Sequence, residues 1–203
     1  LAKALVPTAH YDRGYHPTAT TGVMAAAAAA GKILGLDADG IESALGIALS
    51  QAAGSMQFLA DGAWTKRSHV GQAAQNGLTC ATLAAEGFKG PKEAIEGKWG
   101  FLHSLSPKAD LDKAAANLGD YWETMALGVK PYPSCRYTHA AMDAIRQLAD
   151  EHGIAADDVD SATIGVPETG WKIVGNSDVE KQNPKSIVVG QSSMPFGAAV
   201  VLL

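Results

Sequence analysis

Apolar side chains recur every three or four residues along several segments of the chain, which is the spacing of helices that bury one face. In one of these segments Ile41, Leu45 and Leu49 fall on a single stripe. Asp37 precedes this stripe and is a residue type that caps helix N-termini well. We therefore predict a helix that begins after Asp37 and ends near Gly54.

Two other segments, residues 23–34 and residues 68–86, are rich in alanine and other helix formers. The second segment has small side chains on one helical face, namely Ala73, Ala74, Gly77, Ala81 and Ala84. Small residues let a neighbouring helix approach closely, so we expect the helix over residues 68–86 to lie at the centre of a helical bundle.

The pattern changes in the second half of the chain. Residues 124–129 are typical of a strand, and residues 139–152 of an amphipathic helix. Residues 162–166 alternate in polarity like a second strand. The sequence therefore predicts a mainly α protein, with an all-helical bundle domain at residues 1–120 followed by a smaller α+β domain at residues 121–203.

Charge and composition exclude several classes of function. The net charge is −5 and charges of both signs are scattered, so no basic surface for nucleic acid is expected. No apolar run approaches the about 20 residues that a membrane-spanning helix needs. Cys80 and Cys135 have neither the spacing of a zinc site nor the density of a disulfide framework, which fits a reducing cytoplasm.

Both ends of the sequence have the character of cuts within a longer chain. The first residue is Leu1 rather than methionine, and the sequence stops in an apolar, helix-like run at residues 200–203 without a capping residue. We therefore expect this chain to be a fragment that is inactive on its own.

The segment R-G-Y-H-P-T-A-T-T-G at residues 13–22 is the first candidate for chemistry. Pro17 disfavours a helical conformation at His16, and Thr20 or Thr21 is suited to cap a following helix. His16 is thus expected on a loop that leads directly into a helix, a common position for reactive side chains. The alternative is a structural histidine that binds a backbone carbonyl.

Two further stretches place cations and a histidine at expected helix starts. The first is W-T-K-R-S-H-V-G at residues 64–71, and the second is K-P-Y-P-S-C-R-Y-T-H at residues 130–139. Helix N-terminal amides and nearby cations together favour bound carboxylates. Solvated surface charge is the alternative, and it is the better interpretation for Arg67.

With Q-S-S-M-P-F at residues 191–196, these stretches occur in the order of the signature blocks of the MmgE/PrpD family, which the chain resembles along essentially its whole length. That family includes 2-methylcitrate dehydratase and cis-aconitate decarboxylase. The resemblance implies a helical domain, a lid domain that closes over it, a homodimer and small polycarboxylate substrates. It also implies that complete members are longer and carry an Asp and a His of the active site in an N-terminal part missing here.

The resemblance assigns roles to residues of this chain. The implied catalytic residues are His16, Lys66 and Lys130. The implied substrate contacts are His69, Arg136, His139 and Ser193. Dehydration of a hydroxy acid needs a base that removes a proton next to a carboxylate and an acid that protonates the leaving hydroxyl, and histidine suits either task near neutral pH.

The remaining histidine signals are weaker. His139 begins an amphipathic pattern, so binding a nearby carbonyl as a structural residue is as good an interpretation as binding substrate. His10, His103 and His152 have no motif around them, and surface or packing roles are expected for all three.

The resemblance therefore implies a carbon–oxygen lyase without cofactor, a dehydratase of the 2-methylcitrate type. It has neither metal-ligand spacing nor a nucleotide-binding glycine motif. Phe196 stands where the family often has a tyrosine, which removes a hydroxyl proton donor and disfavours decarboxylation. The alternatives are an epimerase, isomerase or decarboxylase of the same family, or a non-catalytic helical interaction module.

Overall fold

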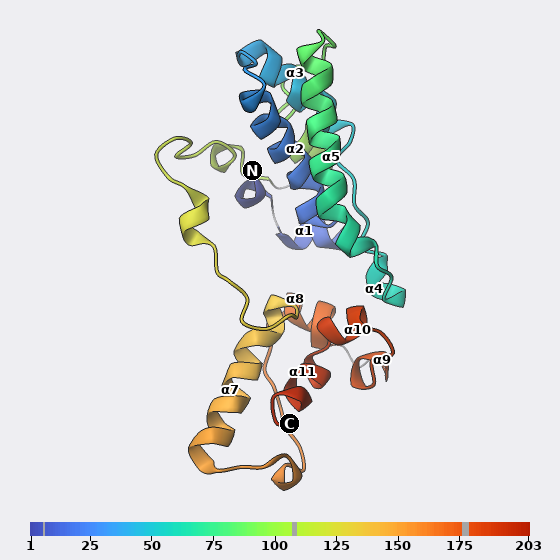
Figure 1. Ribbon diagram of the computed structural model, residues 1–203, viewed down its shortest axis with the longest axis vertical. Helices are drawn as coiled ribbons and strands as arrows, with labels where there is room; N and C mark the ends of the chain where they lie inside the picture. The colour runs from blue at the N-terminus through green and yellow to red at the C-terminus, as the bar shows by residue number, and fades with distance from the viewer. Residues whose placement is uncertain (6, 107–108, 176–178) are drawn as a thin grey trace. The chain divides into compact units, whose positions relative to one another are not determined.

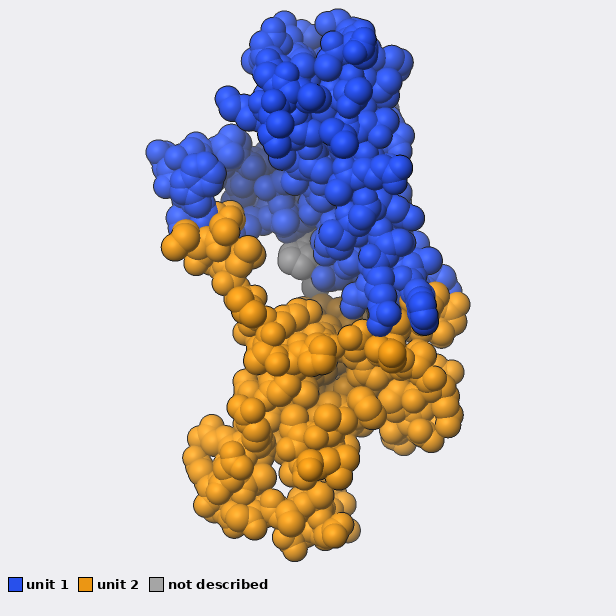
Figure 2. All heavy atoms as spheres, viewed as in Figure 1, with its two compact units in different colours: residues 1–58, 64–122 blue, residues 59–63, 123–203 orange. Residues whose placement is uncertain are grey.

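The computed structural model describes residues 1–5, 7–106, 109–175 and 179–203. These residues are mainly helical, as the sequence predicts, and form two compact units (Figure 1 and Figure 2). Unit 1 comprises residues 1–58 and 64–122, and unit 2 comprises residues 59–63 and 123–203. No helix in the described part of the chain is both long and apolar enough to cross a membrane.

Three long helices lie side by side in unit 1 (Figure 1): α2 (Pro17–Ile33), α3 (Ala38–Leu49) and α5 (Thr65–Ala85). The shorter elements of this unit are η1 (Ala2–Ala4), α1 (Pro7–Asp12), α6 (Phe101–Leu105) and η2 (Leu111–Lys113). One core joins these helices and includes Met24, Ala44, Cys80 and Phe101. Helix α5 packs against both α2 and α3, so it is central to the bundle as predicted.

Helix α5 approaches α2 closely because both helices carry small residues where they meet. A Cβ atom built on Gly22 of α2 would lie 3.1 Å from the Cβ of Ala73. A Cβ atom built on Gly77 of α5 would lie 2.4 Å from the Cβ of Ala26 and 2.7 Å from the backbone nitrogen of Ala27. Close packing leaves no room for a side chain at Gly77, so this glycine sets the distance between the helices.

We expect Gly77→Ala to lower the free energy of unfolding of unit 1 by about 1–3 kcal/mol, because the new methyl group overpacks the contact with α2. Gly71→Ala is the matched control in the same helix, since no atom lies within 4 Å of a Cβ at Gly71. There the higher helix propensity of alanine should raise stability by about 0.5–1 kcal/mol. Denaturant unfolding of the two variants measures the difference, and equal effects would contradict the close packing.

Helix α2 begins at Pro17, ahead of the segment 23–34 that the alanine pattern indicates. Proline suits the first helical position, because its φ is already helical and the N–H that it lacks would have no partner there. Thr20 and Thr21 therefore lie inside the helix and do not cap it. Instead the Thr21 hydroxyl donates to the Pro17 carbonyl over 2.6 Å.

The other long helices agree with the prediction in type and differ at their ends. Asp37 caps α3 as expected, since its Oδ1 accepts the Gly40 N–H over 2.9 Å, but the helix ends at Leu49 rather than near Gly54. Helix α5 begins at Thr65, earlier than the predicted residue 68. This earlier start places the Lys66 stretch in the first turn of the helix.

Unit 2 is built around α7 (Arg136–His152), which packs against α11 (Met194–Val200). Its other elements are η3 (Glu123–Ala126), η4 (Ala156–Asp158), α8 (Glu168–Gly170), η5 (Trp171–Gly175), α9 (Val179–Gln182) and α10 (Ile187–Gln191). The segment 59–63 of this unit includes most of α4 (Phe58–Asp61). The buried apolar side chains of unit 2 are Met142, Val174, Val188, Met194 and Ala198.

The two strands predicted in the second half are wrong, although the mainly α class is confirmed. Residues 123–126 form η3, and residues 162–166 have no strand partner among the described residues. A strand needs a neighbour that completes its ladder of backbone hydrogen bonds, and polarity alone does not supply one. The alternation at 162–166 marks a different feature, since Ala162, Ile164 and Val166 all line an apolar cavity.

Candidate active site

The loop that carries His16 is held at its backbone by the segment that follows α3. The His16 N–H donates to the Gly54 carbonyl over 2.9 Å, and the Met56 N–H donates to the Gly14 carbonyl over 2.8 Å. An isolated antiparallel bridge joins the same two segments. His16 is therefore placed directly before α2 by contacts that do not depend on its side chain.

Gly54 also brings this loop close to α5. It has φ of +136°, a conformation that side chains disfavour, and a Cβ atom there would lie 2.4 Å from the Cβ of Ala19 and 3.7 Å from Nδ1 of His69. Only glycine fits this position without displacing α2. The close approach sets the separation between the His16 loop and His69.

The imidazoles of His16 and His69 are in direct contact. Their Nδ1 atoms are 3.0 Å apart, and the ring centroids are 5.2 Å apart with the planes tilted by 42°. His69 is buried, with 6% of its surface exposed, whereas His16 is partly exposed. The structure thus brings together one predicted catalytic residue and one predicted substrate contact.

Phe58 and Lys66 complete this group, which we call the His16 cluster (His16, Phe58, Lys66 and His69). The Phe58 ring makes edge contacts with both imidazoles, with centroid distances of 5.8 Å to His16 and 5.7 Å to His69. The Lys66 Nζ lies 5.8 Å from the centroid of the Phe58 ring. Phe58 was not among the predicted site residues, and its only signal in the sequence is its place six residues before the W-T-K-R stretch.

The cluster favours neutral histidines. Burial lowers the pKa of His16 to about 4, and the positive charges of His69, Lys66 and His10 act in the same direction. Burial also lowers the pKa of His69. Both imidazoles are therefore neutral at neutral pH, and the lone pair of His16 is free to accept a proton.

His10 and Arg13 support the loop from outside the cluster. His10 is fully buried, and its Nε2 lies 3.0 Å from the Thr20 hydroxyl in the first turns of α2. Burial lowers the pKa of His10 as well. The Arg13 guanidinium donates to the Ser104 carbonyl of α6. The packing role predicted for His10 agrees with these contacts.

The stretch at residues 130–139, which we call the Lys130 block, lies in unit 2 and has its own set of contacts. Lys130 is exposed, and its Nζ donates to the Ser134 carbonyl over 3.1 Å. Arg136 donates to Nδ1 of His139 over 3.1 Å, and Nε2 of His139 lies 3.3 Å from the Ser134 carbonyl. Because arginine only donates, these contacts assign the His139 proton to Nε2. They match the structural alternative for His139, and its role in substrate binding remains a prediction.

Ser193 caps a helix in this structure. It is buried, its Oγ accepts the Phe196 N–H over 3.0 Å, and its hydroxyl donates to the Lys181 carbonyl. Lys181, which the sequence analysis did not single out, is also buried and donates through Nζ to the carbonyls of Ile173 and, over 2.7 Å, Ser192. The hydroxyl of Ser193 is thus engaged at the start of α11, and a substrate contact there remains a prediction.

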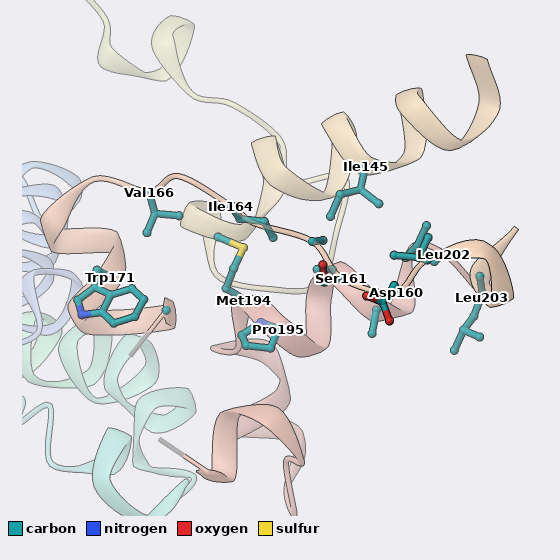
Figure 3. A pocket seen from close by; sticks show the side chains of 16 residues that line it. Ile145, Asp160, Ser161, Ile164, Val166, Trp171, Met194, Pro195, Leu202 and Leu203 are labelled. Atoms are coloured by element: carbon teal, nitrogen blue, oxygen red, sulfur yellow. The ribbon is translucent and has the colours of Figure 1, made fainter. Parts of the chain in front are cut away.

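Two cavities lie within unit 2. One, of about 570 Å³, is lined by Tyr132, Ser134 and Phe196 among others, so it joins the third and fourth sequence blocks. The other, of about 580 Å³, is mainly apolar; Figure 3 shows Ile145, Ile164 and Met194 around it. Neither of these two cavities is lined by a histidine. Both therefore differ in chemistry from the His16 cluster.

The predicted site residues form two groups, one in each unit. Unit 1 contains His16, Lys66 and His69, and unit 2 contains Lys130, Arg136, His139 and Ser193. Convergence of the two groups on one cleft remains a prediction. Over the described ranges, no three His, Cys, Asp or Glu side chains are arranged to hold a metal ion.

Comparison with known proteins identifies relatives over the whole chain. It is 31% identical over 213 aligned positions to a cis-aconitate decarboxylase of Aspergillus terreus, covering 100% of this chain and 43% of that protein. It is 36% identical over 144 positions to a cis-aconitate decarboxylase-like protein of Aspergillus oryzae, covering 68% of this chain and 30% of that protein. The human cis-aconitate decarboxylase is 33% identical over 133 positions, covering 64% and 27% respectively.

The chain spans less than half the length of these relatives. Residues 1–114 match the MmgE/PrpD N-terminal domain, and residues 132–203 match the MmgE/PrpD C-terminal domain. The first match includes the His16 cluster, and the second includes Arg136, His139 and Ser193, whereas Lys130 lies between the two matched ranges. The chain belongs to the MmgE/PrpD family.

Proposed function

We propose that the whole protein is a lyase that dehydrates a small hydroxy polycarboxylate of the 2-methylcitrate type, with the His16 cluster as its proton-transfer centre. The observation that carries this proposal is the partly buried, neutral His16 in a cluster with the cationic Lys66. A neutral imidazole is a proton acceptor, and a fixed cation stabilises the negative charge that develops on a carboxylate when a neighbouring C–H bond breaks.

The pKa of about 4 describes His16 without a bound anion. Burial is the main cause of this lowered pKa, and the positive charges of His69 and Lys66 add to it. A polycarboxylate next to Lys66 and His16 would offset the contribution of these charges and so raise the affinity of His16 for the substrate proton. His16 in our proposal removes the proton alpha to a carboxylate, and the C–H electron pair forms the new double bond as hydroxide leaves with a proton. Lys66 holds the carboxylate that shares the developing charge.

The roles of the unit 2 residues rest on the family blocks. We assign Lys130 to catalysis, and Arg136, His139 and Ser193 to substrate binding. A homodimer is part of the same proposal and rests on the family resemblance alone, because the small-residue face of α5 is buried against α2 within unit 1. A cytoplasmic location, with neither nucleic acid nor membrane as partner, is part of the same proposal.

Decarboxylation of cis-aconitate is the second candidate. The named relatives are cis-aconitate decarboxylases, which favours it. Phe196 favours dehydration instead, because a phenyl ring at the family's tyrosine position supplies no hydroxyl proton. Its side chain is 41% exposed and lines the 570 Å³ cavity, so a tyrosine there would have presented its hydroxyl at an open surface.

An assay of the whole protein against 2-methylcitrate and cis-aconitate tests the proposal. We expect 2-methylcitrate to gain double-bond absorbance without release of carbon dioxide. Carbon dioxide from cis-aconitate would favour the second candidate. A folded protein that converts neither acid nor related hydroxy acids would leave the non-catalytic interaction module as the better account.

Lys66→Met is expected to weaken substrate binding by about 10- to 100-fold, because it removes one charged hydrogen bond to a carboxylate. Arg67→Met is the matched control: it removes the neighbouring cation, which is exposed and lies 5.5 Å from the centroid of the Trp64 ring. Comparing KM and the melting temperature of both variants of the whole protein measures the effect. Equal loss in the two variants would show that general surface charge, and not Lys66, attracts the substrate.

A further inference from the structure

The contact between His16 and His69 joins the same nitrogen, Nδ1, of two imidazole rings over 3.0 Å. A neutral imidazole carries one N–H and one lone pair. Two Nδ1–H groups repel each other, and two lone pairs form no hydrogen bond. The contact therefore requires that one ring carries its proton on Nδ1 and the other on Nε2.

This pairing gives the two outer nitrogens complementary properties. The ring that donates through Nδ1 has a lone pair on Nε2, and the ring that accepts at Nδ1 has a proton on Nε2. Transfer of the shared proton from one Nδ1 to the other exchanges these two properties. The pair is thus able to take up a proton at one Nε2 and to release a different proton from the other.

Burial and nearby positive charges disfavour an extra proton on this pair of imidazoles. His69 is 6% exposed, and the Phe58 ring edge packs against both imidazoles. The groups whose positive charges act on His16 are His69 and Lys66, both on α5, and His10 on α1. Both rings protonated at once would place two Nδ1–H groups face to face, so the contact accommodates only one added proton.

We propose that His69 relays the proton that His16 removes from the substrate, so that the two imidazoles work as one acid–base unit. This inference rests on the proposed function, and it gives His69 a part in proton transfer beyond the substrate contact predicted from the sequence. The separation of 3.0 Å between the Nδ1 atoms is within direct proton-transfer distance.

The relay moves one proton in each step. The lone pair on Nε2 of His16 forms an N–H bond as the substrate C–H bond breaks, and the C–H electron pair stays on the substrate. The Nδ1 proton of His16 passes to Nδ1 of His69, which releases its Nε2 proton to water. The reverse transfers, with the leaving hydroxyl taking the Nε2 proton of His16, return the pair to its starting state.

Nitrogen-15 NMR of the whole protein, labelled at histidine and free of ligand, tests the required tautomers. At neutral pH we expect a protonated Nδ1 in one ring of the pair and a protonated Nε2 in the other. His16→Gln and His69→Gln each remove one set of signals and so assign them. The same tautomer in both rings would overturn the relay, whatever an activity assay shows.

His69→Gln in the whole protein tests the transfer itself. Glutamine is polar and similar in size to histidine, but it does not conduct a proton. We expect kcat to fall by about 10² with little change in KM, and exchange of the substrate alpha proton with deuterated solvent to fall equally. His152→Gln, at an exposed site on α7 in unit 2, is the control and should keep full activity and exchange.

The outcomes separate this inference from the proposed function. Unchanged kcat and exchange in His69→Gln would overturn the relay and leave His16 as a base on its own. A wild-type protein that neither converts the acids nor exchanges their alpha protons would instead end the proposed function. In that case the ligand-free tautomers still decide whether the histidines form a complementary pair.

Discussion

His16→Gln is expected to lower turnover of the whole protein by about 10²–10⁴, the usual worth of one positioned proton-transfer group. The backbone of this residue is held through Gly54, and that hydrogen bond survives the substitution. The fold and most of the substrate affinity should therefore persist while proton transfer is lost.

A purely structural His16 would behave differently. Its loss would leave the buried Nδ1 of His69 without a partner, at a cost of about 1–3 kcal/mol, and the folded fraction would keep its rate per site. Turnover normalised to folded protein and melting temperature, measured on the same sample, distinguish the two cases. A destabilised variant with full activity per site would end the catalytic assignment.

The stability of unit 1 should rise with pH between about 4 and the ordinary histidine value of 6.5, in part because of His16. In this window the unfolded chain holds a proton on His16 that the folded chain excludes. Folding must release this proton, so it becomes less favourable as the pH falls. The contribution is fully present above 6.5 and is lost as the pH falls toward the folded pKa of about 4. Its size is at most about 3 kcal/mol, with His10 and His69 acting in the same direction.

Hydrogen exchange of the α2 and α5 amides, measured across this pH range, reports the stability of unit 1. Wild type should show a steeper rise with pH than His16→Gln, whereas His152→Gln should follow wild type. Identical pH profiles for wild type and His16→Gln would show that His16 titrates normally in the folded chain.

The helices could be predicted because their causes are local. Asp37 caps α3 through its own side chain, and the apolar stripe that follows fixes the buried face. The predicted helix starts were less accurate. Helix α2, for example, begins at Pro17, before its alanine-rich part. The strands failed because a strand depends on a partner elsewhere, which the polarity of residues 162–166 does not reveal. The domain ranges 1–120 and 121–203 remain predictions. For comparison, the long segment of unit 1 ends at Trp122 and that of unit 2 begins at Glu123.

In the candidate site, too, the features that depend on local sequence were predicted and those that depend on tertiary contacts were not. Three residues that the family blocks single out, His16, Lys66 and His69, belong to one cluster. The contact between the two imidazoles depends on the close approach at Gly54, a tertiary feature that no local motif contains. Lys181 was missed for a similar reason, because its buried hydrogen bonds go to backbone carbonyls and leave no sequence pattern.

In our proposal the His16 cluster binds a polycarboxylate next to a neutral histidine. The most direct measurement is nitrogen-15 NMR of the histidine-labelled whole protein during titration with tricarballylate, an unreactive tricarboxylate, at fixed pH and ionic strength. We predict saturable changes at His16 and His69 toward the protonated form, reduced in Lys66→Met, with His152 unchanged. No change at His16, or equal changes at His16 and His152, would contradict the account.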